Sequence, residues 1–160
     1  MLYKHFYGYA MSICLMYSSS KEDAVEVLND GFLKVFKNLD HQKKIGSLKA
    51  WIRRIMVNTA IDRLRKDKRQ LDQVPLEKIA YQLVSTIDPD DSYAQEILKM
   101  VQELSPAIRT VFNLYVIEGY SHKEISKNLN VTESTSRAHL SEANKKLRSQ
   151  IKARLKLKNI

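Results

Sequence analysis

The chain has few of the residues that interrupt helices, and almost none of the residue that cross-links secreted proteins. Its 160 residues include one cysteine, Cys14, four glycines and three prolines. A single cysteine excludes an intramolecular disulfide, and few glycines and prolines favour long helices. Neither a signal peptide nor an apolar run near the roughly 20 residues of a membrane span is present. We therefore expect an all-α, cytoplasmic protein with no membrane insertion.

The sequence also lacks a recognisable arrangement of catalytic or metal-binding residues. No glycine-rich phosphate loop is present, and the aspartates of residues 88–91 are interpreted as part of a solvated linker. Four histidines have no ligand-like spacing to one another or to the cysteine, and we expect them at the surface: His5, His41, His122 and His139. We predict no catalytic residue, no metal, no cofactor and no enzyme activity. A small nuclease would need converging carboxylates, which are not recognisable here.

What the chain has in excess is positive charge, distributed unevenly. Its formal net charge is +9. Residues 41–70 contain ten basic and two acidic side chains, and residues 108–160 contain eleven basic and four acidic ones. Residues 71–107 between them have two basic and seven acidic side chains. Two basic bodies flanking an acidic connector suit a polyanion bound by both bodies, with an affinity that salt weakens.

Residues 121–147 form the most informative segment, because they predict two capped helices separated by a tight turn. Ser121 and Glu124 have the spacing of a capping box at the start of the first helix. Asn130 follows that helix and tolerates a positive φ angle, and Thr132 is placed to cap the second helix. This pattern is typical of a helix-turn-helix that binds DNA.

The second of these helices has an inner and an outer face. Ser136, Leu140, Ala143 and Leu147 recur at helical spacing and are expected to pack inward. The opposite side, which we call the recognition face, comprises Ser134, Arg137, Ala138, Ser141, Glu142 and Lys145. Small residues allow close approach to a major groove, where arginine suits guanine and glutamate suits cytosine. A solvated polar face is the ordinary alternative, and the charge distribution favours DNA.

The first half predicts three helices, and the second of them has a surface suited to a partner protein. Ala24, Leu28, Phe32, Val35 and Leu39 form its expected buried seam. Its other side carries an acidic stripe that contains one exposed leucine, a combination that suits a basic and partly apolar protein surface. The residues of this side are Glu22, Asp23, Glu26, Asn29, Asp30 and Leu33.

The third helix is expected to present a basic ridge. A loop over residues 40–47 precedes it, and Leu48, Trp51, Ile52, Ile55 and Met56 are expected to face the core. The ridge and loop together supply Lys43, Lys44, Ser47, Lys49, Arg53, Arg54, Asn58 and Arg65. Phosphates of single-stranded or distorted DNA can follow such a ridge while Asn58 bonds an exposed base edge. For Asp62 we prefer a local ion pair with Arg65 or Lys66.

The domain organisation follows from the prolines and the charge pattern. We predict a first domain over residues 1–70, an acidic linker over 71–91, and a second domain over 92–160. Ser92 is expected to cap a helix whose apolar seam includes Ile97, and a further helix is expected to run from Pro106 to Gly119. The second domain thus holds four helices and a basic tail.

The whole chain resembles bacterial RNA polymerase sigma factors of the extracytoplasmic-function class. The first domain carries the resemblance in Glu22-Asp23-Ala24, Asn29-Asp30-Gly31-Phe32, Ala50-Trp51-Ile52-Arg53-Arg54-Ile55, Asn58, Asp62 and Leu64-Arg65. The second carries it in Leu104-Ser105-Pro106, Glu118-Gly119-Tyr120-Ser121, Glu124-Ile125, Leu129-Asn130-Val131, Thr135-Ser136-Arg137, Ala143 and Lys146-Leu147. The family usually has another helical segment before the stretch that begins at Leu2, so Met1 is expected to mark a shortened start.

The resemblance implies a subunit that brings core RNA polymerase to promoters and helps to open the duplex. It places polymerase docking on the helix over residues 22–39 and minus-ten recognition on the loop and helix that include Asn58. It places minus-thirty-five recognition on Ser134, Thr135, Arg137, Ala138, His139, Ser141, Glu142 and Lys145. An anti-sigma factor is an expected partner, and the chain is expected to act as a monomer in the holoenzyme.

A different class of protein remains compatible with the same residues. A free-standing helix-turn-helix regulator would bind duplex DNA as a dimer, at a palindrome whose half-sites lie about one helical turn apart. A sigma subunit instead acts at an asymmetric two-part promoter. Symmetry therefore distinguishes the two hypotheses.

Overall fold

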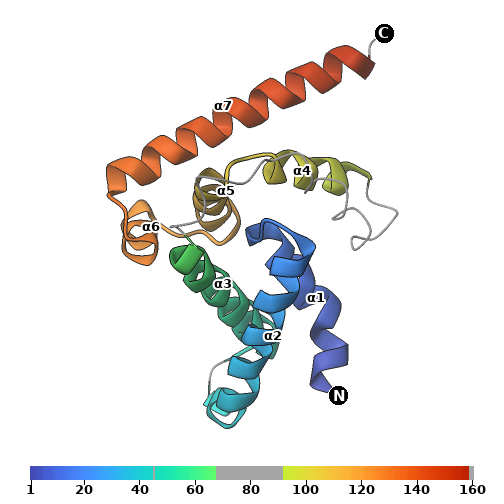
Figure 1. Cartoon of the computed structure of the whole chain (residues 1–160), viewed down its shortest axis with the longest axis vertical. Coiled ribbons are helices and arrows are strands. Elements are labelled where there is room, and N and C mark those ends of the chain that lie inside the picture. Colours follow the sequence, from blue (N-terminus) through green and yellow to red (C-terminus); the bar gives the residue numbers. More distant parts are fainter. Residues whose placement is uncertain (45, 68–91, 159–160) are drawn as a thin grey trace. The chain divides into compact units, whose positions relative to one another are not determined.

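The computed structural model describes residues 1–44, 46–67 and 92–158, and within these ranges every regular element is a helix (Figure 1). This confirms the all-α prediction. The chain divides into two compact units, Met1–Asp91 and Ser92–Ile160. The expected linker, residues 71–91, lies outside the described residues. None of the described helices has the length and apolar character needed to cross a bilayer.

The first unit contains three long helices that pack against one another pairwise. They are α1 (Leu2–Tyr17), α2 (Lys21–Asn38) and α3 (Leu48–Asp67), with a 3-10 helix, η1 (Leu39–Lys44), after α2. Ser20 caps α2 by accepting a 3.1 Å hydrogen bond from the Asp23 amide. All three helices supply fully buried core residues, including Ile13, Leu15, Val27, Leu28, Phe32, Ile52 and Met56.

Helices α2 and α3 approach each other closely at Gly31. A Cβ atom at this position would overlap Met56 Sδ and lie 3.0 Å from Met56 Cε, so a larger residue would require the methionine side chain to shift. Cys14 of α1 meets the same side chain, with its Sγ 4.0 Å from Met56 Sδ. Burial raises the pKa of the Cys14 thiol to about 12. Gly31, Met56 and Cys14 therefore join the three helices.

Three features of the first unit differ from the expectations. The predicted loop over residues 40–47 is largely the 3-10 helix η1, and Leu39 at its start is exposed instead of buried in the α2 seam. The tighter 3-10 winding rotates side chains away from the periodicity of α2. In α3, Ile52 and Met56 are buried as expected, whereas Leu48, Trp51 and Ile55 are only half-buried.

The second unit is built around its long last helix. Its elements are α4 (Ser92–Gln102), α5 (Pro106–Phe112), the π-helix η4 (Asn113–Ile117), α6 (His122–Leu129) and α7 (Glu133–Lys158). Helices α5 and α6 pack on α7, where Leu104, Ile108 and Ala143 form a core bordered by Phe112 and Leu147.

Four details of the second unit differ from the expectations. The helix that begins at Pro106 changes to π winding at the buried Asn113, and Gly119, with φ +74°, follows that π segment. Helix α4 begins at Ser92 itself, the residue that was expected to precede the first helical position. Ile97, expected in the apolar seam, is 57% exposed. The predicted basic tail is helical, because α7 continues without interruption to Lys158.

Candidate nucleic-acid and polymerase interfaces

The turn between α6 and α7 has the predicted capping interactions. Ser121 Oγ accepts from the Glu124 amide at 3.2 Å, and Glu124 Oε2 accepts from the Ser121 amide at 2.8 Å, which completes the capping box. Glu124 Oε2 also accepts from the Ser121 hydroxyl at 2.8 Å, and the bonds it accepts, first from the backbone amide and then from the hydroxyl, hold the pKa of Glu124 below its usual value. Asn130 has φ 53°, and Thr132 Oγ1 accepts from the Thr135 amide at 3.0 Å. The helix-turn-helix geometry is confirmed.

The cap at Ser121 gives a first testable prediction. Replacing Ser121 with alanine removes the acceptor for the Glu124 amide, and we expect the second unit to lose about 1 kcal/mol of unfolding free energy. The measurement is urea unfolding of the full chain, followed by circular dichroism. Ser149→Ala, at an exposed position inside α7, is the matched control and should leave the midpoint unchanged or raise it slightly, because alanine favours helix. Equal midpoints for both variants would contradict the prediction.

The register predicted for the second helix is also confirmed. All six residues of the recognition face are exposed, whereas Ser136 and Ala143 on the other side are fully buried and Leu140 and Leu147 are half-buried. Thr135 and His139, which the resemblance adds to the minus-thirty-five residues, are half-buried. Contact of these eight residues with DNA stays a prediction.

Two charged residues of the recognition face are held by ion pairs along α7. Arg137 Nη2 lies 2.9 Å from Glu133 Oε2, and Lys146 Nζ lies 2.9 Å from Glu142 Oε1. The Lys146 ammonium lowers the pKa of the Glu142 carboxyl, so Glu142 is ionised and can accept hydrogen bonds. Exposed pairs of this spacing contribute only about 0.3–0.5 kcal/mol, so both side chains can be redirected toward a base at little cost.

A part-buried contact that the sequence did not predict joins α6 to α7. His122 Nδ1 and Ser136 Oγ are 2.9 Å apart, and the imidazole stacks on the Tyr115 ring with centroids 4.6 Å apart. His122 is therefore half-buried, as is His139, whereas His5 and His41 are exposed as expected. The contact joins η4, α6 and α7. The one sign of this contact in the sequence is Ser136, a serine in an otherwise apolar seam.

The basic ridge of α3 is largely exposed. Ser47, Lys49, Arg54, Asn58 and Arg65 are exposed and Arg53 is half-buried, while the side chains of Lys43 and Lys44 lie outside the described residues. Lys49 Nζ lies 4.7 Å from the centre of the Tyr9 ring, which positions one cation of the ridge. The ridge therefore presents cations and one amide, Asn58, on a single helix.

Asp62, next to the ridge, pairs with a neighbour as predicted. Arg65 Nη1 lies 3.6 Å from Asp62 Oδ1. A second cation, Lys34 of α2, lies 3.3 Å from Asp62 Oδ2. The local pair is confirmed, and the additional pair connects α2 with α3.

On α2, the expected docking residues differ in their surroundings. Glu22, Glu26, Asn29, Asp30 and Leu33 are exposed, and Leu33 is 58% exposed. Asp23 is instead half-buried: it accepts from the Ser19 amide at 3.3 Å and pairs with Arg63 of α3 at 3.2 Å. Arg63 also pairs with Glu26. Asp23 thus connects α2 with α3 within the first unit.

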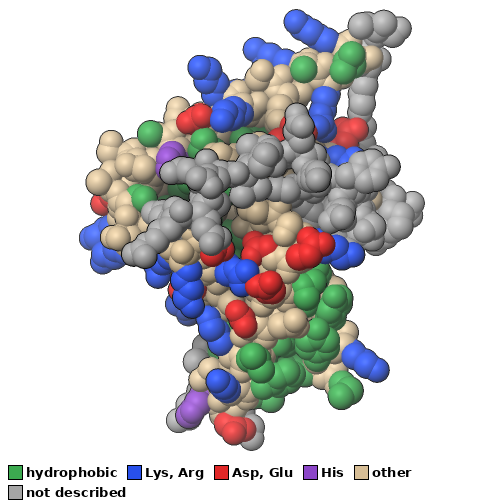
Figure 2. Space-filling view, in the orientation of Figure 1, with side chains coloured by type: hydrophobic (Ala, Val, Ile, Leu, Met, Phe, Trp, Pro, Cys, Tyr) green, Lys and Arg blue, Asp and Glu red, His purple; other side chains and the backbone are tan. Residues whose placement is uncertain are grey.

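Leu33 belongs to an apolar surface that extends across two helices. Phe36, one turn along α2, is also exposed. The Phe36 ring lies 6.1 Å from Phe32, whose ring lies 4.7 Å from Tyr3 of α1. Figure 2 shows apolar side chains gathered over α1 and α2, with acidic side chains beside them. The surface combines the charge and the apolar character that the sequence predicted.

Among the residues that the structure describes, histidine, cysteine, aspartate and glutamate side chains do not gather into a group of three that could hold a metal ion. The exposed helices of both units carry cations, amides and hydroxyls.

Comparison with known proteins agrees with these surfaces. Residues 2–70 match the family described as Sigma-70 region 2, and residues 94–147 match Sigma-70, region 4. The chain belongs to the sigma-70 family, in its extracytoplasmic-function class.

Relatives and a solved structure support this assignment. The chain is 25% identical over 142 residues to the ECF RNA polymerase sigma factor SigE of Mycolicibacterium smegmatis, covering 84% of this chain and 54% of that protein. It is 26% identical over 149 residues to RNA polymerase sigma factor SigV of Bacillus subtilis, covering 91% and 84%. The fold is similar to that of the sigma factor RpoE of Bartonella quintana, solved in complex with the anti-sigma factor NepR, with a TM-score of 0.58, 23% identity and 89% of each chain covered. The chain thus spans about half the length of the first of these relatives and most of the second.

Proposed function

We propose that the chain is a sigma factor that directs core RNA polymerase to specific promoters and assists promoter opening. The observation that carries this proposal is the exposed recognition face of α7, held by a fully capped helix-turn-helix. A DNA-reading helix in one unit and a basic ridge in the other suit a promoter with two separate elements.

In this proposal the two units have different tasks. The recognition face, with Thr135 and His139, enters the major groove of the minus-thirty-five element. Small side chains at Ser134, Ala138 and Ser141 allow close approach, while Arg137 and Glu142 supply a donor and an acceptor for base edges. Losing one such base contact costs roughly 1–3 kcal/mol.

The α3 ridge is proposed to hold the melted minus-ten strand. Lysines and arginines of the ridge neutralise phosphates, and the exposed amide of Asn58 both donates and accepts, as a Watson–Crick edge requires. Base edges of this kind become available only when a base leaves the stack. Binding them therefore favours the open duplex and assists melting.

Core polymerase is the proposed partner of the α2 surface. The exposed acidic residues of α2 attract a basic surface, and Leu33 and Phe36 supply apolar area for it to cover. Catalysis belongs to the polymerase, since sigma factors are initiation factors and not enzymes in themselves. We propose that the chain works as a monomer in the cytoplasm and, like the Bartonella protein, is held by an anti-sigma factor.

The test is transcription from a library of randomised promoters with purified bacterial core polymerase, with and without the full chain. We expect initiation that depends on the chain, from templates that share two spaced elements. A stable dimer that shifts palindromic duplex DNA without polymerase, together with no initiation, would instead establish the free-standing regulator.

A further inference from the structure

We propose that the C-terminal part of α7 is a second DNA-binding surface, which holds the phosphate backbone beside the element contacted by the recognition face. We call the residues that form it, Arg148, Ser149 and Lys152, the C-terminal strip. The inference rests on the proposed function, because it extends the DNA contact of the same helix. The family match ends at residue 147, whereas α7 continues to Lys158.

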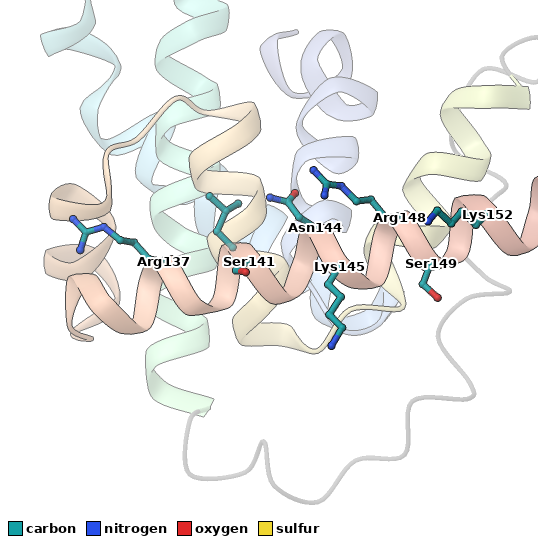
Figure 3. A pocket seen from close by; sticks show the side chains of 8 residues that line it. Arg137, Ser141, Asn144, Lys145, Arg148, Ser149 and Lys152 are labelled. Atoms are coloured by element: carbon teal, nitrogen blue, oxygen red, sulfur yellow. The ribbon is translucent and has the colours of Figure 1, made fainter.

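The C-terminal strip is in helical register with the recognition face. The strip continues the recognition face at spacings of three and four residues: Ser134, Ala138, Ser141, Lys145, Arg148, Lys152. Residues so spaced share one side of a helix. A shallow groove runs along this side of α7, lined from Arg137 to Lys152 (Figure 3).

The C-terminal end of α7 is anchored within its own unit. Arg154, on another side of α7, donates to the Glu96 carbonyl at 3.3 Å and lies 3.7 Å from Glu103 Oε1. Gln150 also donates to Glu103. These contacts hold the end of α7 on the α4 segment of its own unit, so the strip projects from a fixed support.

This side of α7 carries exposed positive charge. Lys145, Arg148 and Lys152 are exposed, and within the part of the chain that the structure describes no ion pair involves any of them. Lys145 interacts electrostatically with Glu142, whereas the charges of Arg148 and Lys152 are not neutralised within that part of the chain, unlike that of Arg154. Uncompensated cations with a neighbouring hydroxyl, that of Ser149, match phosphate oxygens.

Helix α7 is longer than a major groove is wide. At about 1.5 Å per residue, Ser134 to Lys145 spans roughly 16 Å, already more than the about 12 Å width of a major groove. A helix that crosses the groove with its recognition face leaves the groove near Lys145 and meets the phosphate wall. Arg148 and Lys152 follow at about 5 and 10 Å further along the helix.

An acidic protein surface is the competing occupant, because Ile151 and Leu155 of the same helix are exposed. The test separates the two. Full-length wild type, Arg148→Ala/Lys152→Ala and the control Lys21→Ala/Lys37→Ala are compared in binding to fluorescent duplexes at several salt concentrations. The control removes the same charge from exposed positions of α2. One duplex carries the selected minus-thirty-five element and the other a scrambled sequence.

We expect the strip variant to lose affinity for both duplexes by the same factor. The slope of log K against log salt should become shallower by about 1.8, because each lost phosphate contact removes roughly 0.9. Circular dichroism checks that helix content is unchanged. An unchanged slope, or an equal change in the control, would overturn the proposal. So would transcription lost with DNA binding intact, which would assign the strip to a protein partner.

Failure of the proposed function would look different. In that case wild type would not prefer the selected duplex over the scrambled one, and initiation would not depend on the chain. The effect of the strip variant on salt dependence would remain measurable in the same experiment.

Discussion

Leu33→Glu is expected to weaken the affinity of the chain for core RNA polymerase by about 30-fold or more. Leu33 is 58% exposed on α2, among the exposed acidic residues of that helix. If a partner covers it, a buried charge replaces a buried leucine, and central apolar residues of interfaces typically account for 2 kcal/mol or more. The measurement is a titration of fluorescently labelled chain with core polymerase.

Ile97→Glu is the matched control. Ile97 is 57% exposed, on α4 of the other unit, so the substitution has the same chemistry at almost the same exposure. Its affinity for core polymerase should remain within a few-fold of wild type. A comparable loss in both variants would assign the effect to general acidity, and wild-type affinity for Leu33→Glu would remove α2 from the docking surface.

Gly31→Ala is expected to destabilise the first unit by roughly 1–3 kcal/mol, as overpacking of a close-packed core does. The added methyl group would overlap Met56 Sδ, and Met56 is fully buried against Cys14 and cannot move aside freely. Gly8→Ala is the control, because Gly8 is exposed inside α1 with no atom within 4 Å of the new methyl. That variant should gain about 0.5–1 kcal/mol from helix propensity. Thermal and urea unfolding measure both changes.

A double-mutant cycle identifies the cause of the effect. If the overlap with Met56 is responsible, Gly31→Ala should cost much less in a Met56→Ala background, so the two substitutions together cost less than their sum. Strict additivity would show that the cost of the methyl group arises elsewhere. The same cycle distinguishes local overlap from a general loss of helix packing.

The parts of the fold that the sequence predicts are those governed by neighbouring residues. Capping by Ser121 and Thr132, the positive φ of Asn130 and the register of α7 all depend on side chains within four positions of each other. Local chemistry of this kind is visible in a sequence. The recognition face could therefore be placed residue by residue before the structure was known.

The missed features depend on contacts between distant residues. The pairing of His122 with Ser136 requires α6 and α7 to be already assembled, and the π winding begins at an asparagine that becomes buried in the core. Asp23 looks like a surface carboxylate in the sequence, but Arg63, forty residues later, makes it part of the α2 and α3 packing. Each of these features depends on tertiary contacts, which the periodicity of the sequence does not reveal.

The buried cysteine of the first unit has a consequence for the reactivity of the whole chain. A thiol with a pKa of about 12 forms almost no thiolate at neutral pH, and the thiolate is the species that oxidants and alkylating reagents attack. The thiol of the folded chain is therefore expected to react slowly with thiol reagents. A cysteine introduced on α7 would be labelled selectively without removing Cys14. Slow modification of Cys14 itself would then report how often the three-helix core opens.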